Sequence, residues 1–214
     1  MDPGRQICAV LFLAVPPPDH GEFAYLYDEL YIVNCDAELF GERMAAKCTG
    51  QKFEVFLIDH QQSRITEMGS GKNIEELYAY ALRKRSIKSE LTGSGFAWGD
   101  SNVVAGVECM RLWLRLREDG TCRLRVMKEA VPSFVKEVRH YRYKRVAGII
   151  QEKPDDRGKV HLMAAWRYLA QHDPRWVAPK VGRGTMNPVL AALKRKQNKK
   201  NEDRPLVMLG PGGA

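Results

Sequence analysis

Apolar residues in this chain occur as short continuous runs and as helically spaced stripes, a combination typical of a buried sheet with helices packed around it. Two runs predict buried strands, at residues 7–15 and 53–59, and the second ends abruptly on the carboxylate of Asp59. A third strand is predicted over residues 22–33. The prolines and the Asp19-His20-Gly21 segment before it favour a hairpin-type connection.

Helix signals lie between and after these strands. Asp36 predicts the start of one helix that ends at Gly50, and Asn73 with Glu76 forms a capping box before another. A helix between two strands of one sheet is a crossover, so we expect parallel or mixed pairing. Further helices are predicted over residues 102–117, from 132 to 144 and over 161–170, and a strand with one wet face is predicted over 122–127.

Composition suits one domain with a tail. The 214 residues are 44% hydrophobic, and no apolar run approaches membrane-spanning length. We expect a domain over residues 1–177 and a flexible, basic, Pro- and Gly-containing tail over 178–214. Five scattered cysteines indicate reduced thiols in a cytosol rather than a zinc site. A net charge of +8 is compatible with a polyanionic partner.

The candidate chemistry is acidic. A charge at the carboxyl end of a buried strand lies where open α/β sheets place their ligands, and Asp2 lies beside another predicted strand. Two close carboxylates need a cation, and Mg²⁺ or Mn²⁺ held by oxygen ligands can activate water for phosphodiester cleavage. The alternative is that Asp59 merely terminates its strand. The Gly69–Lys72 segment imitates a phosphate-binding loop, but Thr66 and Asn73 break that pattern, so no ATPase signature is present.

The order of motifs resembles the nuclease domain of phage terminase large subunits. The matching segments are Asp2-Pro3-Gly4, YLYDELYI, FEVFLIDH, NVVAGVECMRLWL, EVRHYRYK, EKP and HLMAAWRYLA, over about three quarters of the chain. The resemblance implies an α/β, ribonuclease H-like fold with a central mixed β-sheet flanked by helices. It also implies a metal-dependent endonuclease that cleaves concatemeric double-stranded DNA during genome packaging, with one or two Mg²⁺ or Mn²⁺ ions.

The resemblance assigns site residues position by position. Asp2 matches the first catalytic aspartate and Asp59 the second, and both would bind metal. The family's third acid falls at Val160 or Ala164, so His161 or a nearby aspartate, Asp155 or Asp156, would replace it. Family members also have a strand leading into the first aspartate and a preceding ATPase domain. We therefore expect a separately encoded or truncated nuclease half.

The same resemblance implies partners and leaves alternatives. Double-stranded DNA, a packaging ATPase domain or subunit, a small terminase and a portal would be partners in the host cytoplasm, without a membrane. Two alternatives remain, namely a catalytically impaired DNA-binding or assembly module and a resolvase-like nuclease. Candidate DNA contacts are the basic residues Arg83, Lys84, Arg85 and Lys88 in one segment and Lys194, Arg195 and Lys196 in the tail.

Overall fold

The computed structural model describes residues 1–4, 6–67, 70–155 and 160–178. The chain divides into two units, Met1–Trp176 and Val177–Ala214. Nearly all of the second unit lies outside the described residues, and so do the candidates Lys194, Arg195, Lys196 and Asp156. No helix in the described part of the chain has both the length and the apolar composition needed to cross a membrane.

A mixed sheet forms the centre of the first unit. Its largest part has the order β1-β2-β3-β6, in which β1, β2 and β3 run antiparallel and β6 is parallel to β3. A second pair, β4 and β5, is parallel. The strands are β1 (Asp2–Pro3), β2 (Ile7–Ala14), β3 (Ala24–Val33), β4 (Leu57–Asp59), β5 (Ala97–Gly99) and β6 (Leu124–Val126).

Backbone hydrogen bonds at Met1 join the two parts of the sheet. The Met1 nitrogen donates to the Leu57 carbonyl at 2.6 Å, and the Asp59 amide donates to the Met1 carbonyl at 3.1 Å. Met1 is thus hydrogen-bonded to the residues before and after Ile58, which is the pattern of a parallel pair of strands. The strands therefore follow one another as β5-β4-β1-β2-β3-β6, with β1 near the centre, and the expected mixed pairing is confirmed.

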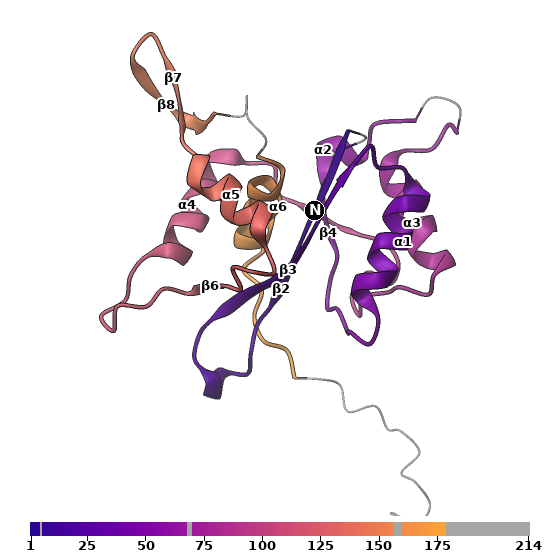
Figure 1. Ribbon diagram of the computed structural model, residues 1–214, viewed down its shortest axis with the longest axis horizontal. Helices are drawn as coiled ribbons and strands as arrows, with labels where there is room; N and C mark the ends of the chain where they lie inside the picture. The colour runs from indigo at the N-terminus through magenta and orange to yellow at the C-terminus, as the bar shows by residue number, and fades with distance from the viewer. Residues whose placement is uncertain (5, 68–69, 156–159, 179–214) are drawn as a thin grey trace, which may run out of the picture. The chain divides into compact units, whose positions relative to one another are not determined.

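Helices cover both faces of this sheet (Figure 1). α1 and α3 pack on one face, and α4, α5 and α6 pack on the other. Alternation along β2 separates the two cores, because Cys8, Val10 and Phe12 face α1 and α3 while Ala9 and Leu11 face the other helices. The helices are α1 (Ala37–Cys48), α2 (His60–Ser63), α3 (Ile74–Lys84), α4 (Val103–Leu114), α5 (Pro132–His140) and α6 (His161–His172), with a 3-10 turn η1 (Pro18–His20).

Several helix starts are those the sequence predicts. Asp36 caps α1 by accepting from the Leu39 amide at 2.7 Å. Asn73 and Glu76 form the expected capping box at α3. In each case a short polar side chain satisfies an amide that the first helical turn leaves unpaired.

Two regions differ from the sequence-based expectation. The strand predicted over 53–59 is regular only in β4, and its earlier part contributes a single bridge from Phe53 to Ser89. The helix predicted to residue 144 ends at His140, and the chain continues as the hairpin β7 (Tyr143–Val146) and β8 (Ile149–Pro154). Ala147 and Gly148 have φ of 48° and 81° in its turn. Positive φ at both central residues is typical of a two-residue hairpin turn, because it matches the right-handed twist of the two strands. The chain therefore forms a hairpin here and does not continue as a helix.

Candidate active site

The sheet places Asp2 and Asp59 side by side. Because Met1 lies between the hydrogen-bonded positions Leu57 and Asp59, the next residue, Asp2, neighbours Asp59 on the adjacent parallel strand. Neighbouring strands are about 4.8 Å apart, and residues in such register direct their side chains to the same face. The two aspartates predicted from sequence are thus brought together.

The face they share is the one covered by α6. Asp2 lies opposite Ala9, whose side chain belongs to the core beneath α4, α5 and α6. Asp59 lies opposite Gly99, and a Cβ added to Gly99 would lie 2.5 Å from the Tyr168 ring of α6. Glycine is therefore needed at this position for α6 to approach the sheet. The close approach brings α6 over both carboxylates.

Two side chains of α6 contact the aspartates. His161 Nδ1 lies 2.7 Å from Asp2 Oδ2, and the Asp2 residue is 5% exposed. The Tyr168 hydroxyl donates to Asp59 Oδ2. Seven residues are about two helical turns, so His161 and Tyr168 lie on the same side of α6. Burial raises the pKa of Tyr168, and its bond to Asp59 adds to this, so the hydroxyl remains a donor at neutral pH.

Asp59 has a second role in the local chain. Its Oδ1 accepts from the Gln62 amide at 2.7 Å and caps the short helix α2. Both oxygens of Asp59 therefore have protein partners, Gln62 and Tyr168. The interpretation of Asp59 as a strand-terminating residue and the interpretation as a site residue are both compatible with this geometry.

Glu137 is a buried carboxyl at the start of α6. Glu137 lies on α5, and its Oε2 accepts from the amides of Leu162 and Met163 in the first turn of α6, at 2.9 and 3.1 Å. Its Oε1 is buried without a hydrogen-bond partner. Burial raises the pKa of Glu137 to about 7. The two amides and a charge on His161 act in the opposite direction, and the Asp2 charge reinforces the effect of burial.

A second buried glutamate anchors α5 in turn. Glu29 on β3 accepts from the amides of Ser133 and Phe134 at 2.8 and 2.9 Å, with one oxygen for each. Glu29 therefore fixes the start of α5, and Glu137 on α5 fixes the start of α6, where His161 meets Asp2. Sequence reasoning missed Glu137, although it is the charged residue on the inward stripe of this helix, between Phe134 and Val138. Such a position is a signal for a buried charge.

A comparison with solved structures finds the g2p large terminase nuclease domain of bacteriophage SPP1, crystallised with bound Mn. The TM-score is 0.50 at 16% identity, over 81% of this chain and 84% of that one. The chain has a ribonuclease H-like fold. No protein-family model matches the sequence, and no curated protein matches it either.

The two positions at which the resemblance places a third acid are not acidic in this chain. Val160 and Ala164 stand at the start of α6, and the amide of Asp155 donates to the Arg142 carbonyl at 2.8 Å, extending the β7–β8 ladder. Among the residues described, no cluster of three or more His, Cys, Asp or Glu side chains could hold a metal ion. The adjacent carboxylates of Asp2 and Asp59 nevertheless fit a hard divalent cation in their oxygen-donor chemistry, as two ligands rather than three.

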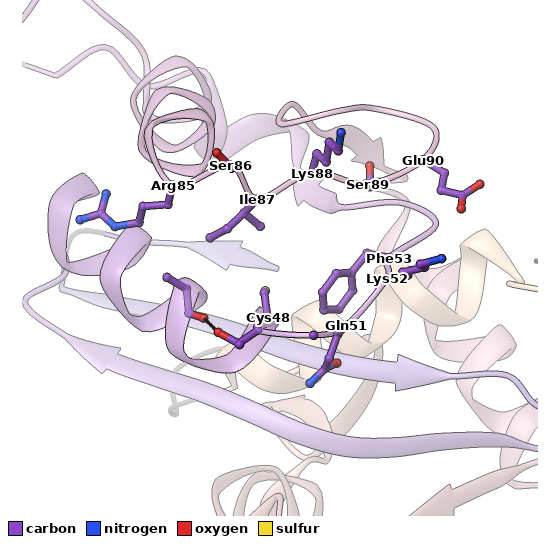
Figure 2. Close-up of a pocket in the computed structure, with 13 residues that line it drawn as sticks. Cys48, Gln51, Lys52, Phe53, Arg85, Ser86, Ile87, Lys88, Ser89 and Glu90 are labelled. Carbon is purple, nitrogen blue, oxygen red and sulfur yellow. Dashed lines mark hydrogen bonds between the residues drawn. The ribbon is translucent and has the colours of Figure 1, made fainter. Parts of the chain in front are cut away.

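The predicted DNA contacts that are described lie on the opposite face of the ribonuclease H-like sheet. Lys84 and Arg85 both pair with Glu38 of α1, whereas Arg83 and Lys88 are exposed. A pocket of about 720 Å³ lies between the end of α1 and the segment after α3, and the residues that line it are drawn in Figure 2. Its apolar wall includes Cys48, Phe53 and Ile87, and Arg85 and Lys88 line it as well. The structure does not bring these basic residues to the carboxylate pair.

Proposed function

We propose that this chain is a metal-dependent endonuclease of the terminase type, acting on double-stranded DNA. The observation that supports this most directly is the register that makes Asp2 and Asp59 neighbours under α6. A ribonuclease H-like sheet with paired carboxylates at the ends of its central strands suits phosphodiester hydrolysis. On this proposal a packaging ATPase, a small terminase and a portal are the further partners.

Asp2 and Asp59 would hold Mg²⁺ or Mn²⁺, which when bound lowers the pKa of water and stabilises the charge of the leaving oxygen. The protein supplies orientation. His161 fixes the rotamer of Asp2, and Tyr168 fixes that of Asp59, each through one hydrogen bond from α6. Such supporting bonds hold reactive groups in place without touching the substrate themselves.

The test is cleavage of supercoiled plasmid with Mn²⁺ and, in parallel, with EDTA. Asp2→Asn and Asp59→Asn should each lower the rate by more than about 100-fold, because even residues that only support metal ligands contribute about 10- to 100-fold. Asparagine at position 59 remains a good helix cap, so α2 should persist. Asp28→Asn is the matched control, since Asp28 pairs with Lys47 at 2.6 Å on the other face of the sheet. Equal cleavage in EDTA and in both site variants would refute the proposal.

A second function has a specific observation in its favour. Both oxygens of Asp59 already accept hydrogen bonds, and no third acid joins the pair among the described residues. These features suit a DNA-binding or assembly module that retains the fold without cutting. Calorimetric titration with Mn²⁺ separates the two, because a binding signal lost in Asp2→Asn and Asp59→Asn supports the nuclease, and no binding supports the module.

A further inference from the structure

Trp98 lies on the strand next to Asp59. In the parallel pair β4–β5, Trp98 lies opposite Ile58 and Gly99 lies opposite Asp59. Trp98 therefore lies one position before Asp59 in the register of these two strands. Since side chains alternate along a strand, it lies on the other face, towards α3. The Trp98 residue is 58% exposed.

This exposed ring is nevertheless held in place. Its Nε1 donates to Glu75 Oε2 at 2.9 Å. The His60 ring lies over it, with centroids 4.4 Å apart and planes at 39°. The Arg64 guanidinium carbon is 5.9 Å from its centroid, and Arg64 Nη1 is 3.5 Å from His60 Nε2. We call Trp98, His60 and Arg64 the Trp98 cluster.

Core packing does not account for this arrangement. Trp113 and Trp166, which do pack in the core beneath α6, are 3% and 1% exposed. The Trp98 residue is instead largely exposed, although burial of an apolar ring stabilises a fold. One structural explanation is that the side chain shields the edge strand β5 from pairing with another chain. The chemistry of its neighbours favours a binding role.

The Trp98 cluster combines a flat aromatic surface with a fixed cation. Nucleobases stack on such rings, and a guanidinium binds the phosphate oxygens next to them. Glu75 is the opposing charge, and it lies at the indole nitrogen of Trp98. A phosphate would therefore approach from the Arg64 side. His60 directly follows Asp59 in the chain.

We propose that the Trp98 cluster binds an unpaired nucleotide of the DNA on the face of the sheet opposite Asp2 and Asp59. The inference rests on the proposed nuclease function and names the form of DNA that the site prefers. Base faces inside a duplex are covered by their neighbours, so only an unpaired nucleotide can stack on Trp98. The site thus favours DNA with single-stranded character over a blunt duplex.

The experiment measures binding of the full chain by fluorescence anisotropy in EDTA, with a labelled 20-nucleotide single strand and the same sequence as a blunt duplex. Trp98→Ala should raise the Kd for the single strand by about 5- to 100-fold, the stacking contribution of one base, and change the duplex Kd less. Trp98→Phe keeps an aromatic ring and should raise the Kd for the single strand less than Trp98→Ala does. Trp176→Ala is the control, because Trp176 is also exposed, at 37%, and lies outside the cluster.

Arg64→Ala provides a second readout that does not depend on the stacking ring. It should lower the slope of log Kd against log salt concentration for the single strand by about one, as expected for one phosphate contact. The inference is overturned if folded Trp98→Ala binds the single strand as the wild type does. It is equally overturned if Trp98→Ala raises the Kd for the single strand and for the duplex by the same factor, or if Arg64→Ala leaves the salt slope unchanged.

Failure of this inference is distinguishable from failure of the proposed function. Binding in EDTA is independent of cleavage, whereas the nuclease proposal is tested by plasmid cleavage with Mn²⁺. A wild type that fails to cut, together with weakened single-strand binding by Trp98→Ala, refutes the nuclease and supports the Trp98 cluster. Normal cutting with unchanged binding by Trp98→Ala refutes the Trp98 cluster alone.

Discussion

Replacing Glu137 with glutamine removes one charge from beneath the start of α6 and leaves its shape unchanged. The glutamine oxygen can still accept from the amides of Leu162 and Met163, as Oε2 of Glu137 does at 2.9 and 3.1 Å. The other oxygen of Glu137, Oε1, is buried without a hydrogen-bond partner. The substitution therefore isolates the effect of ionising Glu137, whose residue is 6% exposed.

The magnitude follows from the change in the pKa of Glu137 on folding. Burial raises it from an ordinary value of 4.5 to about 7. Each pKa unit is about 1.4 kcal/mol, so ionisation in the folded protein costs at most about 3 kcal/mol. Because the folded state binds the proton more tightly, the stabilisation is fully present below pH 4.5. It is lost as the pH rises through 7.

The assay is urea denaturation of the wild type and of Glu137→Gln between pH 4 and 8, in EDTA. The free energy of unfolding of the wild type minus that of the variant should fall by about 2 to 3 kcal/mol between pH 4.5 and 7.5 and then level off. Glu42→Gln, exposed on α1, is the control and should show no such fall. A difference for Glu137→Gln that is independent of pH would show that Glu137 is not held in a buried, protonated form.

Three further substitutions test the contacts that position the site, each by urea denaturation. Tyr168→Phe removes the donor to Asp59 and should cost about 1 kcal/mol; an unchanged free energy of unfolding in both this variant and Asp59→Asn would exclude the bond. Gly99→Ala places a methyl group 2.5 Å from the Tyr168 ring and should cost about 1 to 3 kcal/mol; a neutral result would mean that α6 can move away freely. Glu29→Gln has one acceptor oxygen for the two amides of α5 and should cost about 1 to 3 kcal/mol, and a stabilised variant would contradict the anchoring role.

Much of the fold could be predicted because its signals are local. The run at β2 and the caps at Asp36 and Asn73 depend on residues within one element, and the structure has them where the sequence predicts. β5 and the β7–β8 hairpin were not predicted. β5 is three residues long, and its central residue, Trp98, is exposed, so its pattern of apolar residues contains little information. The hairpin depends on cross-strand pairing and a turn that helical spacing conceals.

Some residues of the candidate site could be predicted from local sequence features, and others could not. Asp59 could be found from sequence because a charge that ends a buried strand is a local feature, and Asp2 because of its motif. The roles of Tyr168 and Glu137 could not be derived, since each contacts residues far away in the chain: Tyr168 meets Asp59, and Glu137 meets Leu162. These contacts follow from the packing of α5 and α6, so no short segment of the sequence predicts them.

The sequence by itself determined most of the strands and helices and the acid that ends β4, because alternation, helical spacing and capping act over a few neighbouring residues. Only the tertiary structure decided that Asp2 and Asp59 are neighbours, that His161 and Tyr168 of α6 contact them, and that Lys84 and Arg85 lie on the opposite face. The physical reason is strand register: hydrogen bonds at Met1 fix the relative position of two strands more than 50 residues apart.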